Sequence, residues 1–164
     1  MARKKILLVD DDMDFITMVT SVLKNEDYEV IPAFNKQEGL EAARREKPDV
    51  AVLDVMMNTP FEGFEMAMAM HNDPLLAKIP VIIQTSIDVL TTHRQNVQEM
   101  AHEYRKNPEY KQLQVILLKD AITGEAGIDY LDEKGNTVWV PVNGFIRKPV
   151  DTKKLLAEIK RVMA

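Results

Sequence analysis

The sequence predicts an α/β protein built on a doubly wound, five-stranded parallel sheet flanked by helices. Short apolar runs alternate along the chain with longer segments that are apolar every three to four residues. Runs this continuously apolar suit parallel strands that are covered on both faces. With 164 residues, of which 46% are hydrophobic and 29% are charged, the chain has the size and composition of one globular domain.

The predicted elements alternate regularly over the first half of the chain. Strands are expected at 6–9, 28–33, 50–53 and 81–85, and helices at 15–23, 36–46 and 63–72. The alternation returns near the end of the chain, where 144–147 reads as a strand. Asp151 can then cap a last helix, which carries its apolar residues on one side.

The stretch between Ser86 and Asn143 loses this alternation. Helical spacing is visible at 97–104, residues 115–118 could form a strand, and residues 130–131 and 137–140 flank a turn typical of a hairpin. We therefore expect one domain over residues 1–164 with an inserted helix and hairpin segment at about 87–142. No separate output domain is expected after the last helix.

Composition excludes several functional classes. The chain has no cysteine, which excludes disulfides, thiolate zinc sites and cysteine nucleophiles. Its longest apolar run is five residues, against the roughly twenty that a membrane helix needs, so we expect a cytoplasmic protein without a membrane partner. A formal net charge of −5 argues against direct binding of nucleic acid.

Acidic residues follow two of the predicted strands directly. Asp10, Asp11 and Asp12 come after the first strand, and Asp54 ends the third. Ligands of open parallel sheets bind outside the carboxyl ends of the strands, so these carboxylates would converge there and need a cation. Oxygen ligands favour Mg²⁺ or Mn²⁺ over zinc. The alternative is that the run 10–12 only caps a helix, but an unpartnered carboxylate at Asp54 would be costly.

Four segments, taken in order, resemble the receiver domain of response regulators in two-component signalling, a CheY-like, flavodoxin-like fold. The first strand with its acidic pair, the strand that ends in an aspartate, the strand that ends in a hydroxyl residue and the strand that ends in Lys-Pro are Ile6–Asp12, Asp49–Met57, Ile79–Ser86 and Gly144–Pro149. The resemblance covers about residues 3–86 and 143–164.

The resemblance implies phosphorylation of Asp54 by the phosphohistidine of a sensor histidine kinase or histidine phosphotransfer protein. The Mg²⁺ that assists this transfer would be held by Asp10, Asp11, Asp54 and the backbone carbonyl of Met56. The protein would catalyse only its own phosphorylation and dephosphorylation, and would signal by switching a face that binds an unknown downstream protein.

Three further residues take roles from the resemblance. Lys148 would pair with the phosphoryl oxygens, Thr85 would hydrogen-bond one of them, and Phe145 would be the aromatic residue that turns inward in response. The oligomeric state is left open, a homodimer included.

This sequence departs from the family pattern at two places. Residues 58–63 contain one more residue before the glycine than the family usually has, and Thr85 and Lys148 lie 63 positions apart, far more than in other receivers.

Two alternative functions remain at this point. One is a metal-dependent aspartyl-phosphate phosphatase or phosphotransferase acting on small molecules, although Asp54-Val55-Met56 lacks the second acid of the Asp-x-Asp motif that such enzymes use. The other is a receiver that docks to its partner without being phosphorylated, against which the retention of Asp11, Asp54, Thr85 and Lys148 argues.

Overall fold

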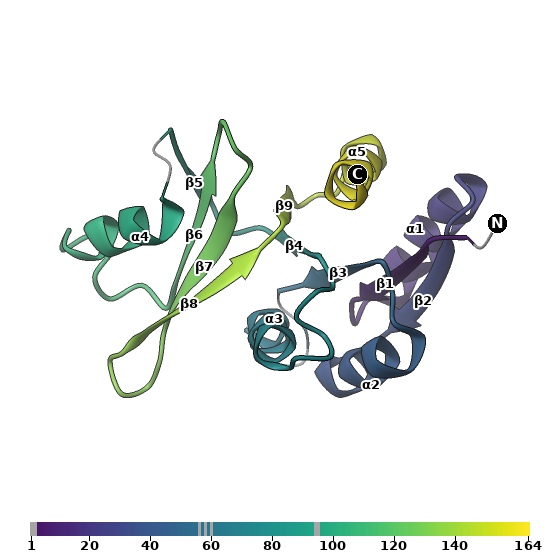
Figure 1. Ribbon diagram of the computed structural model, residues 1–164, viewed down its shortest axis with the longest axis horizontal. Coiled ribbons are helices and arrows are strands. Elements are labelled where there is room, and N and C mark those ends of the chain that lie inside the picture. Colours follow the sequence, from purple (N-terminus) through teal and green to yellow (C-terminus); the bar gives the residue numbers. More distant parts are fainter. Residues whose placement is uncertain (1–2, 56, 58, 60, 94–95) are drawn as a thin grey trace. The chain divides into compact units, whose positions relative to one another are not determined.

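The computed structural model describes residues 3–55, 57, 59, 61–93 and 96–164. The chain divides into two compact units, the first running over residues 1–86 and 146–164 and the second over residues 87–145 (Figure 1). Within the described ranges, no helix combines the length and the apolar character needed to cross a membrane.

A five-stranded parallel sheet forms the centre of the first unit and confirms the predicted fold class. Its strands lie in the order β2-β1-β3-β4-β9. Their bounds are β1 (Lys5–Val9), β2 (Glu29–Ala33), β3 (Val50–Asp54), β4 (Val81–Thr85) and β9 (Gly144–Arg147). β2 lies at an edge of the sheet, which is where Pro32 is tolerated because proline cannot donate a ladder hydrogen bond.

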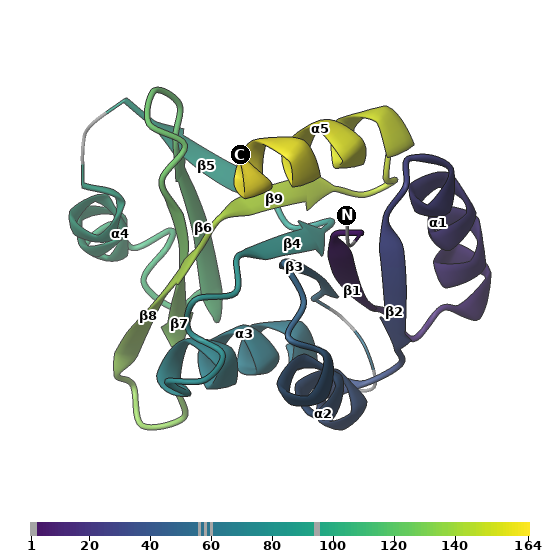
Figure 2. The same cartoon turned by 45° about the vertical axis from the view of Figure 1, so that its right-hand side comes forward.

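Helices cover both faces of this sheet (Figure 2). α1 (Met13–Asn25) and α5 (Thr152–Met163) pack on one face, and α2 (Lys36–Glu46) and α3 (Glu62–Asn72) pack on the other. Asp12 caps α1 by accepting hydrogen bonds from the N–H groups of Asp14 and Phe15, at 3.0 and 3.2 Å. Asp151 caps α5 in the same way, as the sequence predicted.

A hydrophobic core lies between the sheet and the helix pair α1 and α5. Because side chains alternate along each strand, every second strand residue enters this core. Its buried members are Ile6, Leu8, Ile16, Val19, Leu23, Tyr28, Val50, Val52, Ile82, Ile146, Leu155 and Ile159. Following the same alternation, the next residues along β1, β3 and β4 that share this face are Asp10, Asp54 and Gln84.

The second unit contains a four-stranded sheet in the order β5-β6-β7-β8, together with α4 (Val97–Arg105). The strands are β5 (Val89–Thr92), β6 (Val115–Asp120), β7 (Ala126–Leu131) and β8 (Thr137–Val142). β5 pairs in parallel with β6, and β6 to β8 pair in antiparallel fashion. The predicted helix, strand and hairpin are present, whereas β5 was not predicted.

A buried ion pair connects α4 to the second sheet. Arg105 Nε donates to Asp129 Oδ1 of β7 at 2.8 Å, and the guanidinium also donates to the carbonyl of Tyr110 at 3.0 Å. Both side chains are almost fully buried, so removal of either partner would leave a charge uncompensated. This pair fixes how α4 lies on its own sheet.

Gly63 marks the closest approach of α3 to β3. The N–H of Gly63 donates to the carbonyl of Val55 at 3.0 Å, and a Cβ added at Gly63 would lie 2.0 Å from the carbonyl oxygen of Asp54. Gly39 in α2 differs, because an added Cβ there would meet the flexible thioether end of Met66 at 2.7 Å. Backbone cannot move aside as a methionine methyl group can.

We predict that Gly63→Ala lowers the free energy of unfolding by roughly 3 kcal/mol, because the new methyl group must push α3 away from β3. Gly39→Ala is the matched control and should change it by less than about 1 kcal/mol, since the helix propensity of alanine offsets the repacking of Met66. Urea unfolding of the two variants measures both values. Equal destabilisation by the two substitutions would contradict this account.

Candidate functional site

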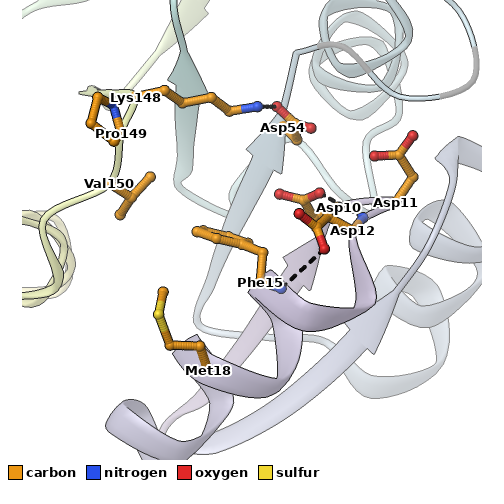
Figure 3. Close-up of a pocket in the computed structure, with 9 residues that line it drawn as sticks. All are labelled: Asp10, Asp11, Asp12, Phe15, Met18, Asp54, Lys148, Pro149 and Val150. Carbon is orange, nitrogen blue, oxygen red and sulfur yellow. Dashed lines mark hydrogen bonds and ion pairs between the residues drawn. The ribbon is translucent and has the colours of Figure 1, made fainter.

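Carboxylates and one amine converge at the carboxyl edge of the first sheet. Asp10 follows β1, Asp54 ends β3, and Lys148 follows β9. A cavity of about 450 Å³ opens over them (Figure 3). The described residues lining it are Asp10, Asp11, Asp12, Phe15, Met18, Asp54, Lys148, Pro149 and Val150. The predicted convergence of the two acidic groups is therefore observed within the first unit.

Lys148 extends across the cavity and forms an ion pair with Oδ1 of Asp54 (Figure 3). The Asp54 side chain is almost fully buried, whereas the Lys148 side chain is 35% exposed. The backbone N–H of Lys148 donates to the carbonyl of Thr85 at 2.9 Å, which holds the start of the Lys-Pro segment beside the end of β4. A partly exposed amine on a flexible stem can follow a group that is added to Asp54.

Asp10 is buried beneath the cavity and is held at both carboxylate oxygens. Its Oδ1 accepts from the N–H of Asp12 at 2.9 Å, and its Oδ2 accepts from Nε2 of Gln84 at 3.0 Å. Burial raises the pKa of Asp10 from its ordinary value of 3.8 to about 6, and the neighbouring charge of Asp54 adds to the shift. Asp11 is exposed and also lines the cavity.

The three acidic residues fit a hard divalent cation. Asp10, Asp11 and Asp54 can each offer a carboxylate oxygen such that the three atoms lie within 4.8 Å of one another. Carboxylates repel at this separation, and oxygen-only ligands are those that Mg²⁺ prefers. The residues present therefore fit Mg²⁺. The proposed fourth ligand, the carbonyl of Met56, lies outside the described residues.

Thr85 lies on β4, the strand next to that of Asp54, and Phe145 lies on β9, one strand further along the sheet. Thr85 is buried at the end of β4, and Phe145 is buried in β9. Neither is among the described residues that line the cavity. Their roles in hydrogen bonding to a phosphoryl group and in switching remain predictions.

Sequence reasoning missed Gln84, a buried amide in β4 whose neighbour in the paired strand β3 is Asp54. A polar residue after Val81, Ile82 and Ile83 is the same signal that drew attention to Asp54. Asp12, which the sequence analysis placed in the acidic group after the first strand, with helix capping as the alternative, does both: it caps α1 and lines the cavity.

Comparison with known proteins links this site to one family. The sequence model of the response regulator receiver domain matches residues 6–117. PilH of Pseudomonas aeruginosa is 33% identical over 104 residues, which cover 63% of this chain and 85% of PilH. The alkaline phosphatase synthesis transcriptional regulatory protein PhoP of Bacillus subtilis is 36% identical over 86 residues, which cover 52% of this chain and 35% of PhoP. Lys148 lies outside the residues that this sequence model matches, and the structure brings it to Asp54.

Solved structures share the fold. The chemotaxis response regulator CheY4 of Vibrio cholerae superposes with a TM-score of 0.61 and 22% identity, covering 98% of this chain and 99% of CheY4. A CheY-like receiver domain protein from Methanospirillum hungatei gives a TM-score of 0.59 at 22% identity, covering 99% of this chain and 94% of that one. At such identities the likeness concerns the fold.

We predict that Asp10→Asn stabilises the metal-free protein at pH 7.5 by on the order of 1 to 3 kcal/mol. The folded-state pKa of Asp10 lies above its ordinary value. Below about pH 4 this carboxyl is protonated and does not weaken the fold. The free energy of unfolding falls as the pH rises through about 6, because the buried group becomes charged. The gain should therefore vanish near pH 4. Gln84 can turn its amide so that Oε1 accepts from the new Asn amide.

Chemical denaturation between pH 4 and 8 in the presence of a chelator measures this difference. The exposed Glu133, far along the chain in the turn between β7 and β8, supplies the control variant Glu133→Gln, which should change the free energy of unfolding by less than about 0.5 kcal/mol at every pH. An Asp10→Asn protein no more stable than the parent at pH 7.5 would show that burial of this charge is not costly.

Proposed function

Because this chain belongs to the response regulator receiver domain family, whose members are phosphorylation-dependent signalling proteins, we propose that Asp54 is its phosphoryl acceptor. The observation that carries this assignment is the ion pair between Lys148 and Asp54, beside the acidic pair Asp10 and Asp11. In this proposal, residues around one cavity would supply a nucleophilic carboxylate, a cation-binding group and an amine that can follow the phosphoryl group.

Receiver domains take phosphoryl groups from histidine kinases or phosphotransfer proteins. For this chain we infer the same donor class. A carboxylate oxygen of Asp54 would attack the phosphorus atom of a phosphohistidine, an O–P bond would form, the P–N bond would break, and the imidazole would leave with that bond's electron pair. Such a transfer requires mainly positioning and charge stabilisation from the protein.

The residues of the site divide this work. Asp10, Asp11 and Asp54 would hold Mg²⁺, which when bound neutralises negative charge on the phosphoryl group. Lys148 keeps its amine at Asp54 and would pair with a phosphoryl oxygen once the carboxylate is modified. The hydroxyl of Thr85 would donate to another of these oxygens.

Coupling to a partner would follow from these contacts. Thr85 and Lys148 lie at the ends of neighbouring strands and are joined by a backbone hydrogen bond. A phosphoryl group bound to both side chains would therefore shift the ends of β4 and β9 together. Phe145 lies in β9, three residues before Lys148, and is proposed as the side chain that changes conformation. The downstream partner would read that change.

We favour signalling over catalysis on small molecules, because receiver-domain response regulators are generally signalling proteins. The only reaction we assign to this chain is its own phosphorylation and dephosphorylation. The chain spans 85% of PilH but only 35% of PhoP and 23% of the response regulator PleD of Caulobacter vibrioides. The outputs of the longer relatives are therefore not carried over.

Residues 87–142 are proposed to be an insertion that adapts one receiver domain to its partner. In support, residues 87–145 form a compact unit with a sheet and a helix of their own. The segment also begins directly after Thr85-Ser86 and ends just before Phe145, so it joins the two strands that carry the proposed switch residues.

We predict that acetyl phosphate with Mg²⁺ adds one base-labile phosphoryl group to the protein, and that Asp54→Asn abolishes the adduct because it removes the nucleophile. Intact mass spectrometry, with and without mild base, measures the addition. Asp132→Asn, in the turn after β7, is the matched control and should still be modified. An adduct that survives Asp54→Asn would exclude Asp54 as the acceptor.

We also predict that the Lys148→Ala protein still accepts the phosphoryl group on Asp54. Phosphorylation should no longer change the conformation of β9, because the cation that follows the phosphoryl oxygens is gone. Fluorine NMR of fluorophenylalanine at Phe145, before and after phosphorylation, measures the response. The exposed Lys154→Ala in α5 should respond like the parent protein. A full response in Lys148→Ala would remove Lys148 from the switch.

A further inference from the structure

Gln84 is a buried amide side chain near the carboxyl edge of the first sheet that the proposed chemistry does not use. It is fully buried in β4, whose residues Val81, Ile82 and Ile83 are apolar. Burying an amide in such surroundings costs free energy unless hydrogen bonds compensate. A leucine or methionine would fill this position without that cost.

The amide of Gln84 is directed at Asp10. Nε2 of Gln84 donates to Oδ2 of Asp10 at 3.0 Å in a buried hydrogen bond. The sheet order places β3 between β1 and β4, and Gln84 is paired in register with Asp54. The side chain therefore reaches past the proposed phosphoryl acceptor to the acidic residue on the far strand.

This contact completes the restraint on the Asp10 carboxylate. Its other oxygen, Oδ1, accepts from the N–H of Asp12 at 2.9 Å. A carboxylate oxygen can accept more than one contact, so both oxygens of Asp10 keep a free direction for a cation while their orientation is fixed. Groups next to metal ligands commonly act in this way, by orienting the ligand before the metal arrives.

The second polar atom of Gln84 indicates that this arrangement is not a stabilising device. Oε1 of Gln84 is buried and has no hydrogen-bond partner in the described part of the chain. A buried acceptor without a partner destabilises a fold, and such groups are rare enough in native proteins to require an explanation. The explanation here is the other end of the same amide, because Nε2 of Gln84 donates to Asp10.

We propose that Gln84 is a positioning residue for the divalent cation, holding the carboxylate of Asp10 in the orientation in which Asp10, Asp11 and Asp54 bind Mg²⁺ together. The inference rests on the proposed function of this edge as a phosphorylation site. Gln84 does not touch the phosphoryl group, and it acts only through Asp10.

The test is a double-mutant cycle in Mg²⁺ affinity. The affinity is measured in the unphosphorylated protein from the NMR chemical shifts of backbone amides during a Mg²⁺ titration. Gln84→Met keeps the length of the side chain and removes the amide. We expect it to weaken Mg²⁺ binding roughly tenfold in the parent protein. In the Asp10→Asn background it should weaken binding less than about twofold, because the carboxylate that Gln84 orients is absent.

A purely structural role would weaken Mg²⁺ binding equally in both backgrounds, and that result would overturn the proposal, as would unchanged binding in Gln84→Met. Gln98→Met, on the exposed surface of α4, is the matched control and should bind Mg²⁺ as the parent does. If the parent binds Mg²⁺ but takes no phosphoryl group from acetyl phosphate, the proposed function fails, while the cycle still reports on Gln84.

A second measurement needs no variant and so does not depend on the folding of Gln84→Met. In the parent protein, the side-chain amide signals of Gln84 should shift during a Mg²⁺ titration and give the same dissociation constant as the backbone amide of Asp11. Gln84 signals that stay fixed while the Asp11 amide titrates would show that the two sites are not linked.

Discussion

Crowding of negative charge at the carboxyl edge of the first sheet is the constraint to which the rest of the site responds. Asp10 and Asp54 are buried there with Asp11 beside them, and three carboxylate oxygens come within 4.8 Å of one another. Each neighbouring polar contact offsets part of that repulsion. Lys148 pairs with Asp54, while the N–H of Asp12 and the amide of Gln84 hold Asp10. The remaining imbalance is what would favour binding of a cation at this edge.

The topology explains why these groups meet at all. In the order β2-β1-β3-β4-β9, the strand bearing Asp54 lies between the strands that lead to Asp10 and to Thr85, and β9 brings Lys148 from residues far along the chain. All of these strands are parallel, so their ends open at the same edge. Gly63 lets the next helix start directly against the backbone of Asp54. Asp54, the proposed acceptor, thus has the start of α3 packed against its backbone and the amine of Lys148 paired with its side chain.

Much of this could be predicted from sequence because polar residues at the ends of apolar runs are conspicuous. Asp10 and Asp54 were found in that way, Lys148 was found through the resemblance of its segment to a receiver domain, and the structure brings the three together. Gln84 was missed because its partner lies two strands away, a distance that no local pattern encodes. β5 was missed because it is short and half exposed, and its pairing with β6 joins residues more than twenty positions apart. Local periodicity predicts helices and strands, whereas a side-chain contact across several strands depends on the order of those strands in the sheet.

The backbone hydrogen bond between Lys148 and Thr85 has a consequence for the kinetics of folding. It closes a loop of more than sixty residues, which contains the whole second unit. The entropy of closing a flexible loop rises only with the logarithm of its length, by about 0.6 kcal/mol for each doubling, so a long loop is tolerated at equilibrium. The rate is more sensitive, because non-local pairings raise contact order. β9, and with it Lys148, is therefore expected to join the sheet late, after the acidic edge has already formed.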